Sequence, residues 1–293
     1  MEVCALNQFS VGIVGGDLRF VRLCEILCAN GIKTCVYALN HPDIPETANI
    51  ITSLEEINQC SYVIGPIPFS RDGKNLFTPL SNVSVSIEMF MQNVTNPFLC
   101  LSVLNNQLIE ALNKRNLKFV DLMEMDEIAI LNAIPTAEGA IQYAMQNSEI
   151  TLNESNCIVL GFGRCGKILA NKLKGIGANV YVEARSTADL AFISTYDYIP
   201  VPLPKLKNVL NKFDFIFNTI PIQILTNEFI DVCKNDAIYI ELASNPGGIV
   251  DVEYTKNKGI QYIPAPGLPG KIAPKTAAKI LYHGLEIIIK EGM

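Results

Sequence analysis

Three glycines in the middle of the chain have the spacing of a dinucleotide-binding loop. They are Gly161, Gly163 and Gly166, preceded by an apolar run and followed at once by a helical pattern. The first glycine permits a tight turn, the second lets the backbone approach a pyrophosphate, and the third lets the helix pack closely on the strand. Arg164 begins that helix, whose N–H groups and positive dipole end would face the phosphates. The sequence therefore predicts a dinucleotide site here.

The end of the next predicted strand bears on which dinucleotide is bound. It reads Glu183-Ala184-Arg185-Ser186. A count of roughly 18–20 residues past the last glycine reaches Ala184 to Ser186, where NAD-binding proteins usually have an acid. Arginine and serine can both donate to a 2′-phosphate. Glu183 could instead serve NAD, although strand alternation should point it away from the face of Ala184. We therefore favour NADP over NAD.

Two further turns are expected at the carboxyl edge of the same sheet, where ligands bind in open α/β folds. Thr219 and Pro221 follow a predicted strand at 214–218, and Ala243 and Ser244 end one at 237–243. We predict that the first pair lines the ribose and the second the nicotinamide. The alternative is that both turns only stop and cap their strands.

Candidate anion-binding residues gather near strand ends in the first half. Gly15 and Gly16 could offer backbone N–H groups to a carboxylate at a helix N-terminus. Asp17 could equally be the N-cap of that helix, with the glycines forming a tight turn. Arg19 and Arg71 are two of only six arginines, and both fall near predicted carboxyl ends of strands. They could bind a dianion or be solvated charges.

The remaining candidates surround two helix starts. Pro135 is expected at the first turn of a helix to about residue 146. Glu138 near that start could accept a proton, although capping is an equal alternative. The last helix, from Pro274, begins with donors that favour an anion. The catalytic candidates are Thr136, Glu138 and Lys271, and the further candidate substrate ligands are Lys275 and Thr276.

Strands and helices alternate through both halves. The alternation predicts two doubly wound parallel-sheet α/β domains with a cleft between them. Residues 1–134 would form a flavodoxin-like substrate domain, on which the helix at 274–293 packs back. Residues 135–273 would supply a linking helix and a Rossmann domain. The expected strands are 11–14, 33–38, 62–64, 83–87, 98–101, 118–122, 157–160, 180–184, 214–218, 237–243 and 260–263, and the expected helices of the first half are 18–29 and 105–115.

Composition excludes several classes of protein. The net charge of −6 argues against a nucleic-acid or anionic-membrane surface. The sequence contains no uninterrupted apolar run of about 18 residues, the length that would indicate a membrane span. The nine cysteines include no CxxC pair, which fits reduced thiols in the cytoplasm. With only His41 and His283, neither of which is assigned a role, we expect no metal site.

Several strings together resemble the A-subunit family of dipicolinate synthases. They include Pro135-Thr136-Ala137-Glu138-Gly139, the segment 242–248 (Leu-Ala-Ser-Asn-Pro-Gly-Gly), the segment 265–270 (Ala-Pro-Gly-Leu-Pro-Gly) and the segment 273–277 (Ala-Pro-Lys-Thr-Ala). The resemblance covers nearly the whole chain and is weakest at about 66–97.

The resemblance implies an oxidoreductase acting on a CH–CH or ring CH–N group. It would oxidise dihydrodipicolinate, or its hydroxytetrahydro precursor, to dipicolinate during sporulation, on a branch of the lysine pathway. The family works in the mother-cell cytoplasm with a flavoprotein-like B-subunit, and a homo-oligomer is left open. The alternatives are another two-domain dehydrogenase of the 2-hydroxyacid or alanine type, which usually needs a catalytic histidine, and a nicotinamide-sensing binding module.

Overall fold

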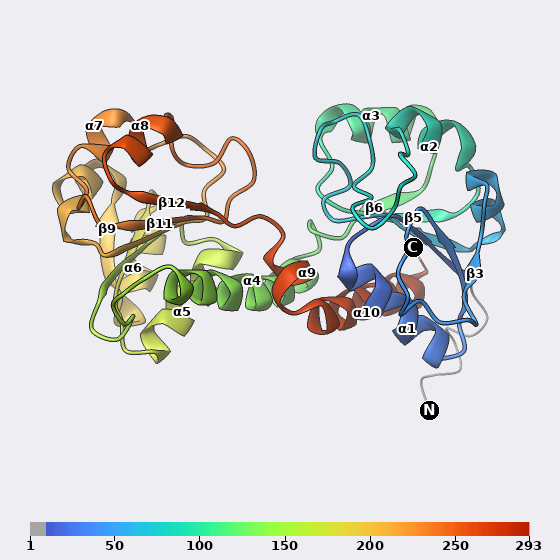
Figure 1. Cartoon of the computed structure of the whole chain (residues 1–293), viewed down its shortest axis with the longest axis horizontal. Coiled ribbons are helices and arrows are strands. Elements are labelled where there is room, and N and C mark those ends of the chain that lie inside the picture. Colours follow the sequence, from blue (N-terminus) through green and yellow to red (C-terminus); the bar gives the residue numbers. More distant parts are fainter. Residues whose placement is uncertain (1–9, 293) are drawn as a thin grey trace. The chain divides into compact units, whose positions relative to one another are not determined.

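The computed structural model describes residues 10–292, which form two compact units (Figure 1). One unit consists of the residues up to Asn132 together with those from Pro269 onward, and the other runs from Ala133 to Leu268. The helix α4 (Asp126–Gln146) contains the boundary between them.

The first unit is built on a six-stranded parallel sheet. Its order is β3-β2-β1-β4-β5-β6, so the chain reverses its direction of winding between β1 and β4. Five of these strands have the flavodoxin order, and the two-residue β3 adds an edge strand that gives the order 3-2-1-4-5-6. The strands are β1 (Ser10–Val14), β2 (Lys33–Tyr37), β3 (Asn49–Ile50), β4 (Tyr62–Ile64), β5 (Phe98–Leu101) and β6 (Phe119–Asp121).

Helices cover this sheet because its strands are apolar on both faces. The last helix of the chain, α10 (Pro274–Glu291), packs against the first, α1 (Leu18–Ala29), as Figure 1 shows in red and blue. Phe20 and Leu27 of α1 share one core with Leu281 and Leu285 of α10. The other helical segments are η2 (Leu54–Gln59), α2 (Ile87–Asn93), α3 (Asn106–Lys114) and the short α9 (Leu268–Ile272).

The second unit repeats the scheme. Its parallel sheet has the order β12-β11-β10-β7-β8-β9, which is the Rossmann order with its switch point between β7 and β10. The strands are β7 (Asn156–Leu160), β8 (Asn179–Ala184), β9 (Ile199–Pro202), β10 (Phe215–Asn218), β11 (Ile238–Glu241) and β12 (Gln261–Pro264). The helical segments after α4 are α5 (Arg164–Gly175), α6 (Thr187–Thr195), η3 (Leu203–Asn208), η4 (Leu210–Lys212), α7 (Asn227–Ile230) and α8 (Val252–Asn257).

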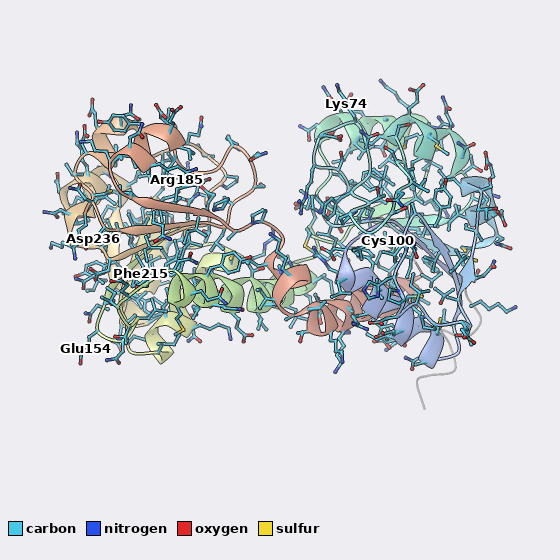
Figure 2. All side chains as sticks on the ribbon, viewed as in Figure 1. Lys74, Cys100, Glu154, Arg185, Phe215 and Asp236 are labelled. Carbon is cyan, nitrogen blue, oxygen red and sulfur yellow. The ribbon has the colours of Figure 1, made fainter. Side chains whose placement is uncertain are left out.

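The two predicted doubly wound parallel sheets are thus confirmed. Side chains fill the interior of each unit, including Cys100 of β5 in the first and Phe215 of β10 in the second, both labelled in Figure 2. In the described residues, 10–292, no helix is long and apolar enough to cross a membrane.

Two local predictions were wrong. The strand expected at 83–87 is absent: Ser86 forms only an isolated bridge with Asn75, and α2 begins at Ile87. The side chain of Ser86 caps that helix by accepting a hydrogen bond from the N–H of Met89, which starts a helix where the apolar run indicated a strand.

Pro135 does not begin a helix. The helix α4 starts nine residues earlier at Asp126, with acidic residues in its first turn, and Pro135 lies inside it. Thr136 and Glu138 therefore lie within a helix and do not open one. The short elements β3, β9 and α9 were not predicted, because two to five residues give too little pattern to recognise.

Candidate cofactor site

The glycine loop of the second unit has the close contacts that its spacing predicts. Gly161 directly follows β7 and has a φ of +93°, in the left-handed region that favours glycine. A Cβ atom on Gly166 would lie 2.1 Å from the carbonyl oxygen of Gly161, so only glycine lets α5 approach the strand this closely. A Cβ on Gly163 would meet nothing within 4 Å. The loop therefore packs at its two outer glycines and leaves open space at the middle one.

A cavity of about 670 Å³ opens beside this loop. That volume is within the range of small-molecule and cofactor sites. It lies over the carboxyl ends of β7, β8 and β10, at the switch point of the sheet. Its lining residues are Gly161, Phe162, Gly163, Glu183, Ala184, Arg185, Ser186, Asp189, Thr219, Ile220 and Pro221.

The predicted specificity residues at the end of β8 line this cavity. Arg185 is exposed, and among the described lining residues it is the only cation. Ser186 is the N-cap of α6, and its side-chain oxygen accepts a hydrogen bond from the N–H of Asp189 at 3.3 Å. The site thus presents a guanidinium and a helix N-terminus side by side, together with the carboxylate of Asp189, which the sequence did not single out.

Glu183 also borders the cavity, although strand alternation predicted that it would face away from the side of Ala184. It is 1% exposed, and its Oε1 atom is buried without a hydrogen-bond partner among the described residues. Burial raises the pKa of this carboxyl, against the smaller lowering effects of the Gly161 N–H and the charge of Arg185. The site therefore contains a carboxyl that takes up a proton more readily than an ordinary glutamate.

The turn after β10 is held against the glycine loop. The hydroxyl of Thr219 donates to the carbonyl oxygen of Leu160 at 2.8 Å, as does its N–H at 3.1 Å. Thr219 and Pro221 line the cavity, as does Ile220 between them. Arg164, Gly166, Ala243 and Ser244 are not among the lining residues, so the structure gathers only part of the predicted cofactor set.

In the first unit, the glycine N–H groups expected to bind a carboxylate are already occupied. The N–H of Gly15 donates to the carbonyl oxygen of Tyr37 at 2.8 Å, and that of Gly16 donates to Phe77 at 3.0 Å. Asp17 caps α1 by accepting from the N–H of Arg19. The capping and tight-turn interpretation is therefore the one that the structure supports.

Arg19 is likewise committed to an internal ion pair. It is 1% exposed, and its Nε and Nη2 atoms each donate to Asp17 at 2.8 Å. Nη2 also donates to the carbonyl oxygen of Ile67 at 3.1 Å. A Cβ on Gly270 would lie 2.3 Å from Asp17 Oδ2, so α9 rests directly on this pair.

Arg71 remains exposed beside the same pair. Its guanidinium carbon lies 3.8 Å from the centre of the Phe77 ring. Partial burial lowers the pKa of Arg71, the charge of Asp17 opposes this shift, and the charge of Arg19 adds to it. Of the two predicted arginines, Arg71 is therefore the exposed one.

Two of the catalytic candidates, Thr136 and Glu138, lie in the second unit, and the third, Lys271, lies in the first. Glu138 is exposed on α4, and its Oε1 atom lies 2.8 Å from Lys172 Nζ of α5. Thr136 lies half-buried two residues earlier. Lys271, Lys275 and Thr276 are exposed at α9 and the first turn of α10.

Neither histidine lines the cavity. His283 hydrogen-bonds to Glu127 at 2.7 Å, and His41 lies near Asp43. Across residues 10–292, no group of histidine, cysteine and carboxylate side chains is arranged to hold a metal ion.

Comparison with known families assigns a different family to each part of the chain. Residues 10–123 match the family described as the N-terminal domain of the dipicolinate synthase A-subunit. Residues 131–253 match the D-isomer specific 2-hydroxyacid dehydrogenase NAD binding domain. Fold and cavity together define a dehydrogenase-type protein with a nicotinamide-dinucleotide-binding domain.

Similarity over the full length is more specific. The dipicolinate synthase A-subunit of Bacillus subtilis (strain 168) is 34% identical over 98% of this chain and 97% of its own length. The crystal structure of the dipicolinate synthase A-subunit from Bacillus halodurans has a TM-score of 0.86 and 32% identity, covering 97% of this chain and 98% of that one. A transhydrogenase from Sinorhizobium meliloti shares the fold alone, with a TM-score of 0.66 and 13% identity over 95% of this chain and 92% of that one. The chain belongs to the A-subunit family of dipicolinate synthases.

Proposed function

We propose that this chain is the dehydrogenase subunit of a dipicolinate synthase and that it uses NADP. The observation that carries the proposal is the similarity, along nearly the whole chain, to the dipicolinate synthase A-subunit, joined to a dinucleotide-type cavity in the second unit. The substrate would be dihydrodipicolinate or its hydroxytetrahydro precursor. The pathway would be a lysine-pathway branch in the mother-cell cytoplasm during sporulation.

Two features support NADP over NAD. Arg185 is the lining cation at the end of β8, where its donors can reach a 2′-phosphate, and Ala184 stands where an acid would repel one. Glu183 is the opposing feature. Burial raises its pKa, so the negative charge that would repel a phosphate is less favoured here than on an ordinary glutamate.

The proposed oxidation removes one hydride and one proton from the ring. The bound nicotinamide accepts the hydride, and the product is an aromatic pyridine dicarboxylate. The protein must orient the ring and receive the proton. Glu138 is the proposed proton acceptor, with Thr136 and Lys271 as the further catalytic candidates. From the hydroxytetrahydro precursor, a molecule of water must also leave.

The two carboxylates of the substrate require fixed cationic or N–H donors. Arg71 is the proposed ligand for one of them, because Arg19 beside it is already paired with Asp17. Lys275 and Thr276 in the first turn of α10 are proposed for the other, where the helix N-terminus adds a favourable dipole. The proposed partner is the flavoprotein-like B-subunit of the synthase.

The proposal is tested by following NADPH formation from dihydrodipicolinate with the purified chain, with and without its cognate B-subunit. We expect NADP reduction that depends on dihydrodipicolinate and increases with the B-subunit. Reduction with a 2-hydroxyacid or alanine instead would favour the alternative dehydrogenase class. Cofactor binding without turnover of any of these substrates would favour a nicotinamide sensor.

A further inference from the structure

A buried carboxylate outside the cavity lining holds together two loops of the second unit. Glu241, the last residue of β11, is 6% exposed. Its Oε1 atom accepts hydrogen bonds from Asn218 Nδ2 at 2.7 Å and from the N–H of Ala243 at 3.1 Å. Its Oε2 atom accepts from the N–H of Gly248 at 2.8 Å and from the Tyr239 hydroxyl at 3.2 Å.

None of the groups that donate a hydrogen bond to Glu241 carries a positive charge. Among residues 10–292, no cationic side chain forms an ion pair with Glu241. All four partners are neutral groups, two of them backbone N–H groups, and a carboxylate can accept a hydrogen bond from each of them. Burial raises the pKa of Glu241, and the hydrogen bonds from Gly248 and Asn218 oppose that shift. A buried carboxyl is costly unless it is hydrogen-bonded, and the four donors around Glu241 offset that cost.

The loop after β11 is shaped to reach this carboxylate. A Cβ on Gly247 would lie 2.8 Å from Glu241 Oε2, and a Cβ on Gly248 would lie 2.5 Å from Asn218 Nδ2. The two glycines are therefore needed for the backbone to come within hydrogen-bonding distance. This contact explains the glycine pair in the Asn245-Pro246-Gly247-Gly248 string.

The network continues from the loop to the cavity wall. Asn218 Nδ2 also donates to the carbonyl oxygen of Ile220 at 2.9 Å, and Asn218 Oδ1 accepts from the N–H of Ile220 at 3.1 Å. Ile220 lines the cavity. A continuous chain of hydrogen bonds thus links the loop at 243–248, Glu241, Asn218 and the cavity wall.

The position of these loops in the sheet indicates which half of a dinucleotide they serve. Arg185 follows β8, on one side of β7, whereas Asn218 and Glu241 end β10 and β11 on the other side. The two halves of a dinucleotide bind on opposite sides of the switch point. The adenosine half with its 2′-phosphate belongs beside β8, and the nicotinamide half beside β10 and β11.

We propose that Glu241 is a positioning residue that fixes the loops after β10 and β11 and thereby shapes the binding site for the nicotinamide half of the cofactor. This inference rests on the proposed NADP-binding function. Glu241 need not touch the cofactor. Its substitution should therefore weaken binding of the nicotinamide half and spare binding of the adenosine half.

The variant Glu241→Gln tests this division with two probes, NADP⁺ and adenosine 2′,5′-bisphosphate, by titration calorimetry. The amide NH₂ of glutamine must face either Gly248 or Ala243, so a donor meets a backbone donor on one side or the other. We expect NADP⁺ binding to weaken at least about tenfold, equivalent to about 1.4 kcal/mol. Binding of the bisphosphate should stay within about twofold. Glu253→Gln, which removes an exposed carboxylate from α8 of the same unit, is the matched control and should change neither.

Asn218→Ser interrupts the same chain at its next link and is the second variant, should Glu241→Gln fail to fold. The same selective loss of NADP⁺ binding is expected. Equal losses for both probes, or no loss for either, in a variant that unfolds at the wild-type temperature would overturn the positioning role. If the wild-type chain binds neither probe, the proposed function itself fails and this inference fails with it.

Discussion

Replacing Arg185 by alanine should separate the binding of NADPH from that of NADH. Arg185 is exposed at the cavity wall, and its charge lowers the pKa of Glu183. Its removal leaves the packing of the core untouched, so we expect only a small change in the unfolding temperature. The substitution takes away the donors proposed for the 2′-phosphate, a group that NADH lacks.

The size of the effect follows from the loss of a hydrogen bond between charged groups. Such a bond contributes about 1.5–3 kcal/mol, which corresponds to about a 10- to 150-fold change in affinity. Loss of the Arg185 charge also removes one of the effects that lower the pKa of Glu183. NADPH binding should weaken by that factor, and NADH binding should stay nearly unchanged.

The assay is a fluorescence titration of both reduced cofactors against the wild type and Arg185→Ala. Lys205→Ala is the matched control, because it removes an exposed cation from η3 of the same unit, outside the cavity lining. It should leave both affinities as they are. Equal losses for both cofactors in Arg185→Ala would refute the reasoning, as would a wild-type preference for NADH that Glu183→Ala relieves.

Three other variants test the glycine loop, the buried carboxyl and the first core. Gly163→Ala should fold normally, since its Cβ meets no protein atom within 4 Å, but should weaken dinucleotide binding at least about tenfold. Gly166→Ala should also lower the unfolding temperature, because its Cβ would lie 2.1 Å from a carbonyl oxygen. Equal unfolding temperatures for these two variants would contradict the packing argument. Glu183→Gln should gain thermal stability relative to the wild type as the pH rises above the ordinary glutamate value of 4.5. The pKa of Glu183 is raised in the folded state, so the wild type loses stability as the pH rises from the unfolded-state pKa through the folded-state pKa. A difference independent of pH would show that ionisation of Glu183 is not the cause. Leu281→Ala, 1% exposed between α10 and α1, should cost about 2–5 kcal/mol of unfolding free energy in urea titrations. A loss below about 1 kcal/mol would show that α10 adds little to that core.

The sequence predicted the long parallel elements well because their signals are strong and local. Apolar runs such as Cys157–Leu160 are buried on both faces of a parallel sheet, and a glycine follows this run directly. The strand expected at 83–87 failed because a serine N-cap outweighs a short apolar run. The start of α4 was misplaced because Pro135, typical of a first turn, is tolerated nine residues inside a helix.

The cofactor loop could be predicted because its glycines have a characteristic spacing and Arg185 falls where the count from the last glycine reaches the end of the next strand. Gly161, Gly163 and Arg185 all line one cavity. The pairing of Arg19 with Asp17 could not be foreseen, since an arginine near a strand end has the same pattern whether it faces solvent or a carboxylate. The network around Glu241 also escaped prediction, because its partners have no characteristic spacing and Asn218 meets Glu241 only when β10 and β11 pair.

The most direct test of the central claim is the stoichiometry of the overall reaction. The purified chain, combined with its cognate B-subunit, is given NADP⁺ and dihydrodipicolinate, and NADPH and dipicolinate are quantified together. We expect the two products to appear in equal amounts and neither to form when this chain is omitted. Dipicolinate forming without NADPH, or at the same rate in the absence of this chain, would contradict the central claim.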